Sequence, residues 1–73
     1  MNLILYGSAG CHLCEQAKAI IETAGASAED VDILDDDVLY ERYGMRIPVM
    51  IRMDTGAELG WPFDAASVMD FLY

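Results

Sequence analysis

Basic residues are scarce in this chain of 73 residues: four Lys and Arg stand against 13 Asp and Glu, and the formal net charge is −9. A nucleic-acid-binding protein needs a basic face that neutralises phosphates, so this composition argues against that class of function. The same charge disfavours docking on an anionic membrane surface. We therefore expect an acidic protein whose partners are neither nucleic acids nor membranes.

Long apolar runs are also missing, since none approaches the ~20 residues that a membrane-spanning helix needs. No basic segment followed by a long apolar stretch opens the chain, so nothing resembles a secretion signal and we expect a cytoplasmic location. The hydrophobic fraction is nevertheless 55%, which is too high for a disordered chain. Residues 1–73 are accordingly predicted to form a single domain, with a monomer as the expected state.

Cysteine is rare as well, and both cysteines lie in one tetrapeptide, Cys11-His12-Leu13-Cys14. A disulfide that closes so short a loop adds little chain-entropy stabilisation, so a purely structural bond is a poor explanation. A structural zinc site requires four ligands, whereas this segment provides two thiols with one imidazole between them. Reversible thiol chemistry is favoured, and a cluster shared between chains or completed by an outside thiol stays open as the alternative.

The first half of the chain predicts a strand, a helix and a second strand. Asn2–Tyr6 is short and apolar and ends in a cluster of small turn-forming residues, which is typical of a buried strand followed by a loop. Apolar residues at helical spacing run from Leu13 to Ala24, and Gly25 stands where a helix ends. Val31–Leu34 is the predicted second strand, so the unit is βαβ with parallel strands.

The second half predicts a helix, a hairpin and a last helix. Three consecutive aspartates precede a short helix over Val38–Tyr43. Met45–Met53 alternates in the manner of a strand, with a Pro near its start, and a turn then leads to a fourth strand over Ala57–Gly60. Asp64 is a good N-cap for the last helix. The predicted order is βαβαββα.

The predicted position of the cysteine pair has a chemical consequence. Only the thiolate attacks a disulfide, and an unperturbed cysteine is about 3% ionised at pH 7. The free N–H groups and positive dipole end at a helix N-terminus favour the anion, and Cys11 comes first along that helix. Cys14, one turn further on, shares the same face and is placed to resolve a mixed disulfide. His12, if protonated, is a candidate for favouring the Cys11 thiolate, with a solvent-facing residue as the equally weighted alternative.

The strand that leads into the CxxC helix, the segment Arg46-Ile47-Pro48-Val49 and the closing hairpin with its helix resemble glutaredoxins, and more closely the short glutaredoxin-like proteins of the thioredoxin-fold superfamily. The resemblance implies an α/β fold with a four-stranded mixed sheet in the order 2-1-3-4, flanked by three helices. It further implies that Cys11 is the nucleophile, Cys14 the resolving thiol and Pro48 a cis proline facing them, and that Ile47 holds an extended substrate through backbone N–H and C=O groups.

The substrate side departs from the pattern of many glutaredoxins, because His12-Leu13 stands between the cysteines and residues 60–64 keep one aspartate, Asp64, where paired aspartates bind glutathione. Arg46 is a further candidate for a substrate carboxylate, as is Arg42. The expected partners are a disulfide-containing protein or glutathione, together with an external reductant, and no resident cofactor or metal is expected.

Two functions follow from these observations. The favoured one is a thiol–disulfide oxidoreductase that reduces protein or glutathione mixed disulfides through the Cys11–Cys14 dithiol. The alternative is a non-catalytic thioredoxin-like binding module that carries a metal or iron–sulfur cluster or docks a partner.

Overall fold

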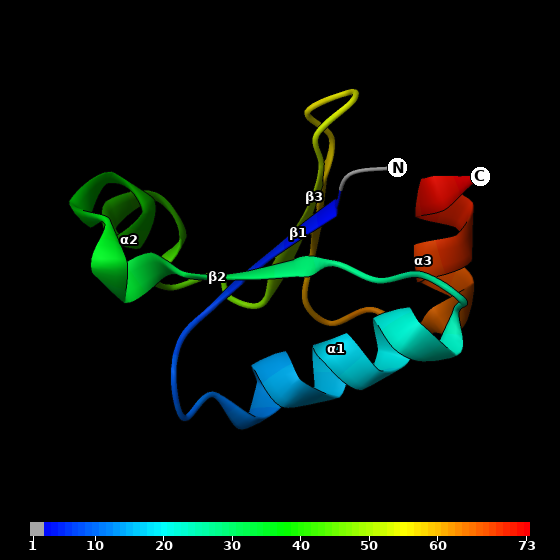
Figure 1. Ribbon diagram of the computed structural model, residues 1–73, viewed down its shortest axis with the longest axis horizontal. Coiled ribbons are helices and arrows are strands. Elements are labelled where there is room, and N and C mark those ends of the chain that lie inside the picture. Colours follow the sequence, from blue (N-terminus) through cyan, green and yellow to red (C-terminus); the bar gives the residue numbers. More distant parts are fainter. Residues whose placement is uncertain (1–2) are drawn as a thin grey trace.

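A four-stranded mixed sheet in the order β2-β1-β3-β4 forms the centre of the computed structural model, which describes residues 3–73 (Figure 1). Along the chain the elements are β1 (Leu3–Gly7), α1 (His12–Thr23), β2 (Glu29–Asp32), the 3-10 turn η1 (Ile33–Asp35), α2 (Asp37–Tyr43), β3 (Val49–Arg52), β4 (Glu58–Gly60) and α3 (Ala65–Leu72). The predicted thioredoxin-like fold and strand order are confirmed. Asn2, the predicted first residue of the first strand, lies outside the described residues.

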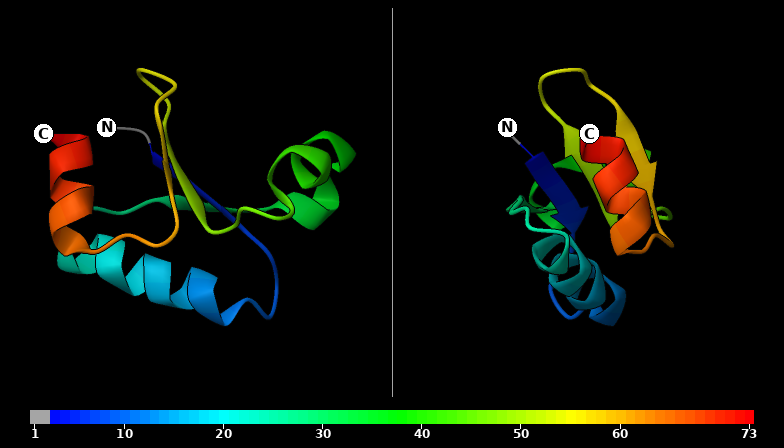
Figure 2. Two further views of the ribbon diagram at one scale, coloured as in Figure 1. Left: turned by 180° about the vertical axis from the view of Figure 1, so that it is seen from behind. Right: turned by 90° about the vertical axis from the view of Figure 1, so that its right-hand side faces the viewer.

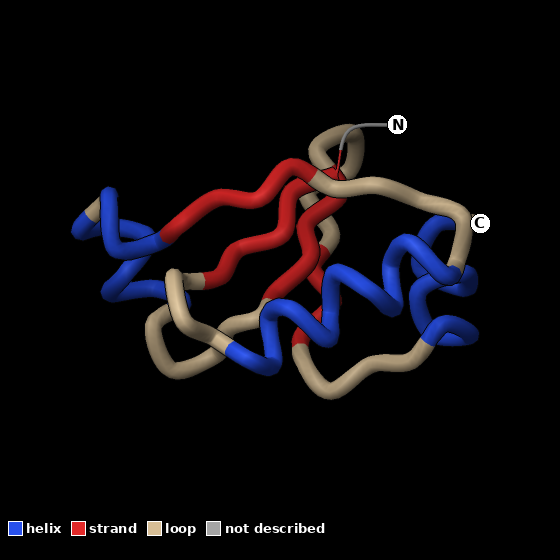
Figure 3. Tube along the Cα trace, turned by 60° about the horizontal axis from the view of Figure 1, so that its bottom comes forward, coloured by secondary structure: helices blue, strands red, loops and turns tan. Residues whose placement is uncertain are grey.

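The sheet is covered on both faces. β1 runs parallel to β2 and antiparallel to β3, and β3 runs antiparallel to β4. Helices α1 and α3 lie together on one side of the molecule and α2 lies apart from them (Figure 2). Figure 3 shows the strands side by side, with a helix running past their lower ends. Because β1 is central, the loop that follows it leaves the middle of the sheet, and this loop leads to Cys11 and to the first turn of α1, where Cys14 lies.

The two faces bury separate apolar clusters, because successive residues of β3 point to opposite sides. Met50 belongs to the cluster under α1 and α3, whereas Val49 and Ile51 belong to the cluster under α2. The alternation predicted for this strand is therefore confirmed, although both faces are buried. The first cluster consists of Leu3, Leu5, Ala17, Ile21, Met50, Phe63, Val68 and Leu72, and the second of Ile33, Tyr43, Val49 and Ile51.

The predicted position of the second strand is wrong by two residues, because β2 covers Glu29–Asp32 and not Val31–Leu34. Parallel pairing of β1 with β2 aligns Gly7 with Asp32, and the side chain of Asp32 then accepts a hydrogen bond from the Leu34 N–H at 2.9 Å. This capping interaction turns the chain into η1, where Ile33 is buried in the α2 cluster. The apolar side chain of Ile33 therefore belongs to a turn that packs against the sheet, whereas Leu34 is exposed.

The third strand is shorter than predicted, since β3 covers Val49–Arg52 of the predicted Met45–Met53. The preceding residues instead fold back on α2: the N–H groups of Arg46 and Ile47 both donate to the carbonyl of Tyr43, at 2.8 and 3.1 Å. Met45 is fully exposed. The segment before Pro48 is thus a turn.

No helix within residues 3–73 combines the length and the apolar character needed to cross a membrane.

Candidate active site around Cys11 and Cys14

A tight turn presents the first cysteine at the end of β1. The N–H of Cys11 donates to the carbonyl of Ser8 at 3.3 Å, and Gly10 has a φ of 77°. A positive φ at this position of a four-residue turn is typical of type II geometry and favours glycine. The turn carries the chain from the centre of the sheet to the start of α1.

Cys11 is the N-cap of α1 and lies one residue before the helix, whereas the sequence predicted it within the first helical turn. Its Sγ atom accepts a hydrogen bond from the backbone N–H of Cys14 at 3.1 Å. N-cap side chains take up one of the N–H groups that the first turn leaves without a helical partner. The sulfur of Cys11 therefore occupies the place in which a helix start stabilises a negative charge.

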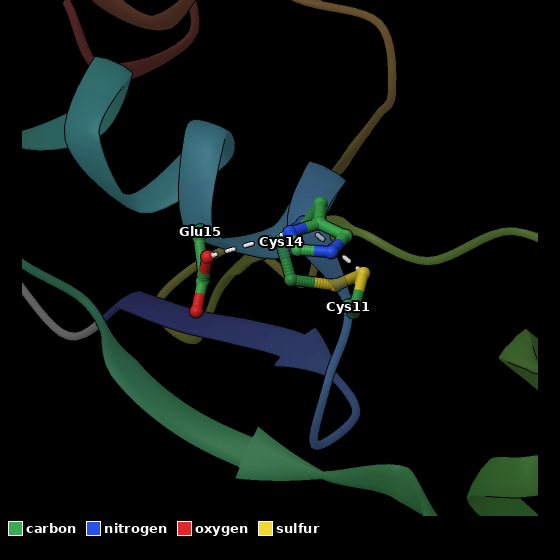
Figure 4. The surroundings of a disulfide bond; sticks show 4 residues. Cys11, Cys14 and Glu15 are labelled. Carbon is green, nitrogen blue, oxygen red and sulfur yellow. Dashed lines mark hydrogen bonds and ion pairs between the residues drawn. A yellow bond between two sulfur atoms is a disulfide. The ribbon is translucent and has the colours of Figure 1, made fainter.

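The two sulfurs are bonded to each other, and both cysteines are half-buried (Figure 4). Their Cα atoms lie 5.2 Å apart, within the ordinary range for a disulfide. Cys14 packs against the end of β1 at Gly7. The arrangement has the three elements that reversible exchange needs: a sulfur at a helix start, a mate within bonding distance, and partial exposure to solvent.

A cleft of about 420 Å³ opens beside the disulfide, on the β2 side of β1. Its ionisable residues are Glu15, Lys18, Asp30 and Asp32, and the Lys18 amino group is paired with Asp30 at 2.8 Å. This pairing raises the pKa of Lys18, first through the hydrogen bond that Lys18 donates to Asp30. The cleft is lined by Leu5, Gly7, Ser8, Ala9, Gly10, Cys11, Cys14, Glu15, Lys18, Asp30, Val31 and Asp32.

The sequence predicted the cysteines and the loop before them as part of the site, but it did not predict the other residues that line this cleft. None of the predicted substrate residues Arg46, Ile47, Pro48 and Asp64 is part of it. Asp30 and Asp32 come from β2, whose position depends on its pairing with β1, so no local pattern could have placed them beside the cysteines.

His12 is exposed, with a side-chain accessibility of 91%, and its Nδ1 lies 3.9 Å from a carboxylate oxygen of Glu15. In Figure 4 a dashed line runs from Glu15 toward the start of α1 and marks this contact. Its assignment as a modulator of Cys11 stays a prediction.

Pro48 lies on the other side of β1 and follows a cis peptide bond from Ile47, as the resemblance implies. The register pairs Tyr6 with Val49, so one step further it brings Pro48 opposite Gly7, the residue that Cys14 contacts. Residues opposite each other in a sheet share a face. That Pro48 faces the cysteines stays a prediction. The proline is fully buried.

The backbone N–H of Ile47 is not free, in contrast to the expectation. Its N–H already donates to the carbonyl of Tyr43, so the prediction that this N–H is free for a substrate strand is wrong for this conformation. The turn after α2 takes up the donor, an arrangement that the alternating pattern of the segment did not indicate. Ile47 stays a predicted substrate contact through its carbonyl.

Arg46 belongs to a polar cluster at the β4 edge. Its Nη2 donates to Glu58 at 2.9 Å, the hydroxyl of Tyr43 donates to the other Glu58 oxygen at 3.0 Å, and Tyr6 stacks on Tyr43 with ring centroids 4.8 Å apart. The hydrogen bond from Tyr43 and then that from Arg46 lower the pKa of Glu58. Burial and the bond to Glu58 raise the pKa of Tyr43. A substrate carboxylate would have to compete with Glu58 for Arg46.

This cluster predicts a pH dependence of stability. Because the pKa of Glu58 is lower in the folded than in the unfolded chain, the stabilisation is present above its ordinary value of 4.5 and is lost as the pH falls below that value toward the folded pKa. We expect Glu58→Gln to lower the urea midpoint at pH 7, and the difference from wild type to shrink in acid. Glu41→Gln is the control, since the side chain of Glu41 makes no hydrogen bond or ion pair within residues 3–73. A constant difference at every pH would contradict the expectation.

Asp64 is the N-cap of α3, as predicted, and its carboxylate accepts the N–H of Ser67 at 2.8 Å. This hydrogen bond is the main cause that lowers the pKa of Asp64. The side chain thus has a structural partner, and its assignment to substrate binding stays a prediction.

Within residues 3–73 the structure places no three His, Cys, Asp or Glu side chains together in a way that could hold a metal ion. The alternative of a metal or cluster therefore depends on the two thiols and on ligands from elsewhere.

Comparisons with known proteins agree with this geometry. A family model described as a glutaredoxin-like domain (DUF836) matches residues 2–73. No curated protein matches the chain. Among solved structures, the crystal structure of the structural genomics target XcR50 from X. campestris is similar, with a TM-score of 0.90 and 42% identity over 96% of this chain and 93% of that one.

Two more distant structures are also similar. Protein Ne2328 from Nitrosomonas europaea has a TM-score of 0.74 and 25% identity over 96% of this chain and 88% of that one. Thioredoxin 1 from Thermosipho africanus has a TM-score of 0.65 and 14% identity over 99% of this chain and 90% of that one, which shows the common fold alone.

Proposed function

Because the chain belongs to the glutaredoxin-like domain family, we propose that it is a thiol–disulfide oxidoreductase whose Cys11–Cys14 pair cycles between dithiol and disulfide. The observation that carries the proposal is the position of the Cys11 sulfur as the N-cap of α1, hydrogen-bonded by the N–H of Cys14 and linked to the Cys14 sulfur. A helix start lowers the free energy of a thiolate, which is the attacking form.

The reaction has two exchange steps. The Cys11 thiolate attacks one sulfur of the substrate disulfide, so that a mixed disulfide forms and the first substrate thiolate leaves. Cys14 loses its proton and attacks the Cys11 sulfur, which closes the Cys11–Cys14 bond and releases the second substrate thiol. Two electrons pass to the substrate, and an external dithiol or two monothiols must reduce the pair again. The cytoplasm, where disulfides are kept reduced, suits such a cycle.

The charges around the pair favour a protein disulfide over glutathione as substrate. Lys18, the cation of the cleft, is paired with Asp30, and Arg46 is paired with Glu58. Glu15 and Asp32 leave the cleft with an excess of negative charge, on a chain of net charge −9. A substrate with two carboxylates is disfavoured by this field, whereas a neutral or basic peptide is not.

A turnover assay with two disulfides tests the proposal. A basic peptide with a mixed disulfide to a small neutral thiol and the matching glutathionylated peptide are each reduced by the protein, with dithiothreitol as the final reductant. We expect catalysed reduction of both peptides, with the larger kcat/KM for the neutral mixed disulfide at low salt and a smaller difference at high salt. A wild-type rate equal to the uncatalysed rate for both substrates would contradict an oxidoreductase.

A further inference from the structure

Gly7, the last residue of β1, lies directly beneath the sulfur of Cys14. A Cβ atom added to Gly7 would lie 2.9 Å from Cys14 Sγ and 3.2 Å from Cys14 Cβ. The first distance is shorter than real Cβ contacts, so a side chain at position 7 would force one of the two groups to move. In Figure 4, β1 runs beneath the first turn of α1 that carries the pair.

The backbone conformation at position 7 does not explain why the residue there is glycine. Among the described glycines only Gly10, Gly25 and Gly56 have a positive φ, so Gly7 has a conformation that any residue adopts. Glycine inside a strand lowers stability and often marks a place where another group approaches closely. Gly60, at the end of β4, is a contrast because nothing lies within 4 Å of its missing Cβ. At Gly7 the group that approaches closely is the side chain of Cys14.

We propose that Gly7 is a positioning residue that sets the balance between the disulfide and the dithiol, because the space it leaves is required mainly when Cys14 is bonded to Cys11. This inference rests on the proposed function, since it concerns the same pair. In the disulfide, the bond to Cys11 fixes the Cys14 sulfur over Gly7. In the dithiol, Cys14 is free to rotate about its Cα–Cβ bond to another staggered position and to move its sulfur away. A methyl group at position 7 therefore penalises the oxidised form more than the reduced form.

The test is Gly7→Ala, with the pair equilibrated against oxidised and reduced dithiothreitol. Two electrons and two protons pass from the reference dithiol to the Cys11–Cys14 disulfide, so the ratio of the two forms gives the reduction potential. We expect the equilibrium to shift at least tenfold toward the dithiol, which corresponds to a potential about 30 mV less negative. Gly60→Ala is the matched strand glycine and is expected to leave the potential unchanged.

Urea unfolding of the oxidised and the reduced forms separates positioning from a general packing defect. We expect Gly7→Ala to lower the midpoint of the oxidised protein more than that of the reduced protein. Equal lowering of both midpoints, with an unchanged potential, would overturn the inference while leaving the oxidoreductase proposal intact. Failure of the wild-type protein to catalyse exchange would count against the proposed function and not against the role of Gly7 in the equilibrium.

A variant without the disulfide tether keeps the inference testable if Gly7→Ala does not fold. In a Cys11→Ser background Cys14 is never bonded, so adding Gly7→Ala is expected to cost less stability than it does in the oxidised wild type. Folding of this double variant beside an unfolded oxidised single variant would support the inference. If the double variant also fails to fold, the space at Gly7 is needed whether or not the pair is bonded, and the inference is wrong.

Discussion

Cys11→Ser is expected to reduce disulfide exchange to the uncatalysed rate, whereas Cys14→Ser is expected to leave a protein that accumulates mixed disulfides. The Cys11 sulfur is the one that caps α1 and accepts the Cys14 N–H, so the attacking thiolate is assigned to it. A serine hydroxyl at position 11 is not ionised at neutral pH and forms no bond to sulfur. With Cys14 replaced, the first exchange step proceeds but the intramolecular attack that releases the second substrate thiol does not.

The measurement is non-reducing mass spectrometry of each variant after incubation with a peptide disulfide, beside the rate of peptide reduction. The expected product of Cys14→Ser is a one-to-one adduct at Cys11 that dithiothreitol reverses. Ser8→Ala is a suitable control, because the Ser8 contribution to the turn is its backbone carbonyl, which the substitution keeps. Adduct formation by Cys11→Ser, with none by Cys14→Ser, would exchange the two roles.

The second large effect concerns the pH at which Cys11 becomes reactive. Reduced Cys14→Ser protein leaves Cys11 as the single thiol. Because a helix start favours the thiolate, we expect the rate of iodoacetamide alkylation to reach half its maximum well below pH ~8.5, the value of an unperturbed cysteine. The midpoint is the informative quantity, since the intrinsic nucleophilicity of a thiolate falls with its basicity.

The same variant unfolded in urea provides the control for this titration. Unfolding removes α1 and its N–H donors, so the midpoint is expected to return to pH ~8.5. The same preference for the Cys11 thiolate in the folded state has a second consequence. Between the Cys11 alkylation midpoint of the folded protein and that of the unfolded protein, the reduced protein gains stability as the pH rises. Identical midpoints in the folded and unfolded protein would remove the physical basis of the proposed nucleophile.

Much of the candidate site could be predicted because its signals are local. Turn-forming residues before Cys11, apolar positions at helical spacing after it and Gly25 at the end together define the helix on which the pair lies. Two intervening residues bring Cys14 to the same face one turn later, and the structure joins the two sulfurs. Asp64 as the N-cap of α3 is another signal that depends on a few neighbouring residues. The cis bond before Pro48 was implied by the resemblance to glutaredoxins, while the residues alone would have favoured a trans bond.

The order of the elements and the helix start at the cysteines follow from the residues alone, since each depends on contacts within one or two turns of chain. Pairing between strands decided the rest. It placed β2 two residues earlier than the apolar pattern indicated and so brought Asp30 and Asp32 to the cleft beside the cysteines. These contacts join segments far apart in the chain, and their register is set by packing over the whole sheet, which no local pattern of residues encodes.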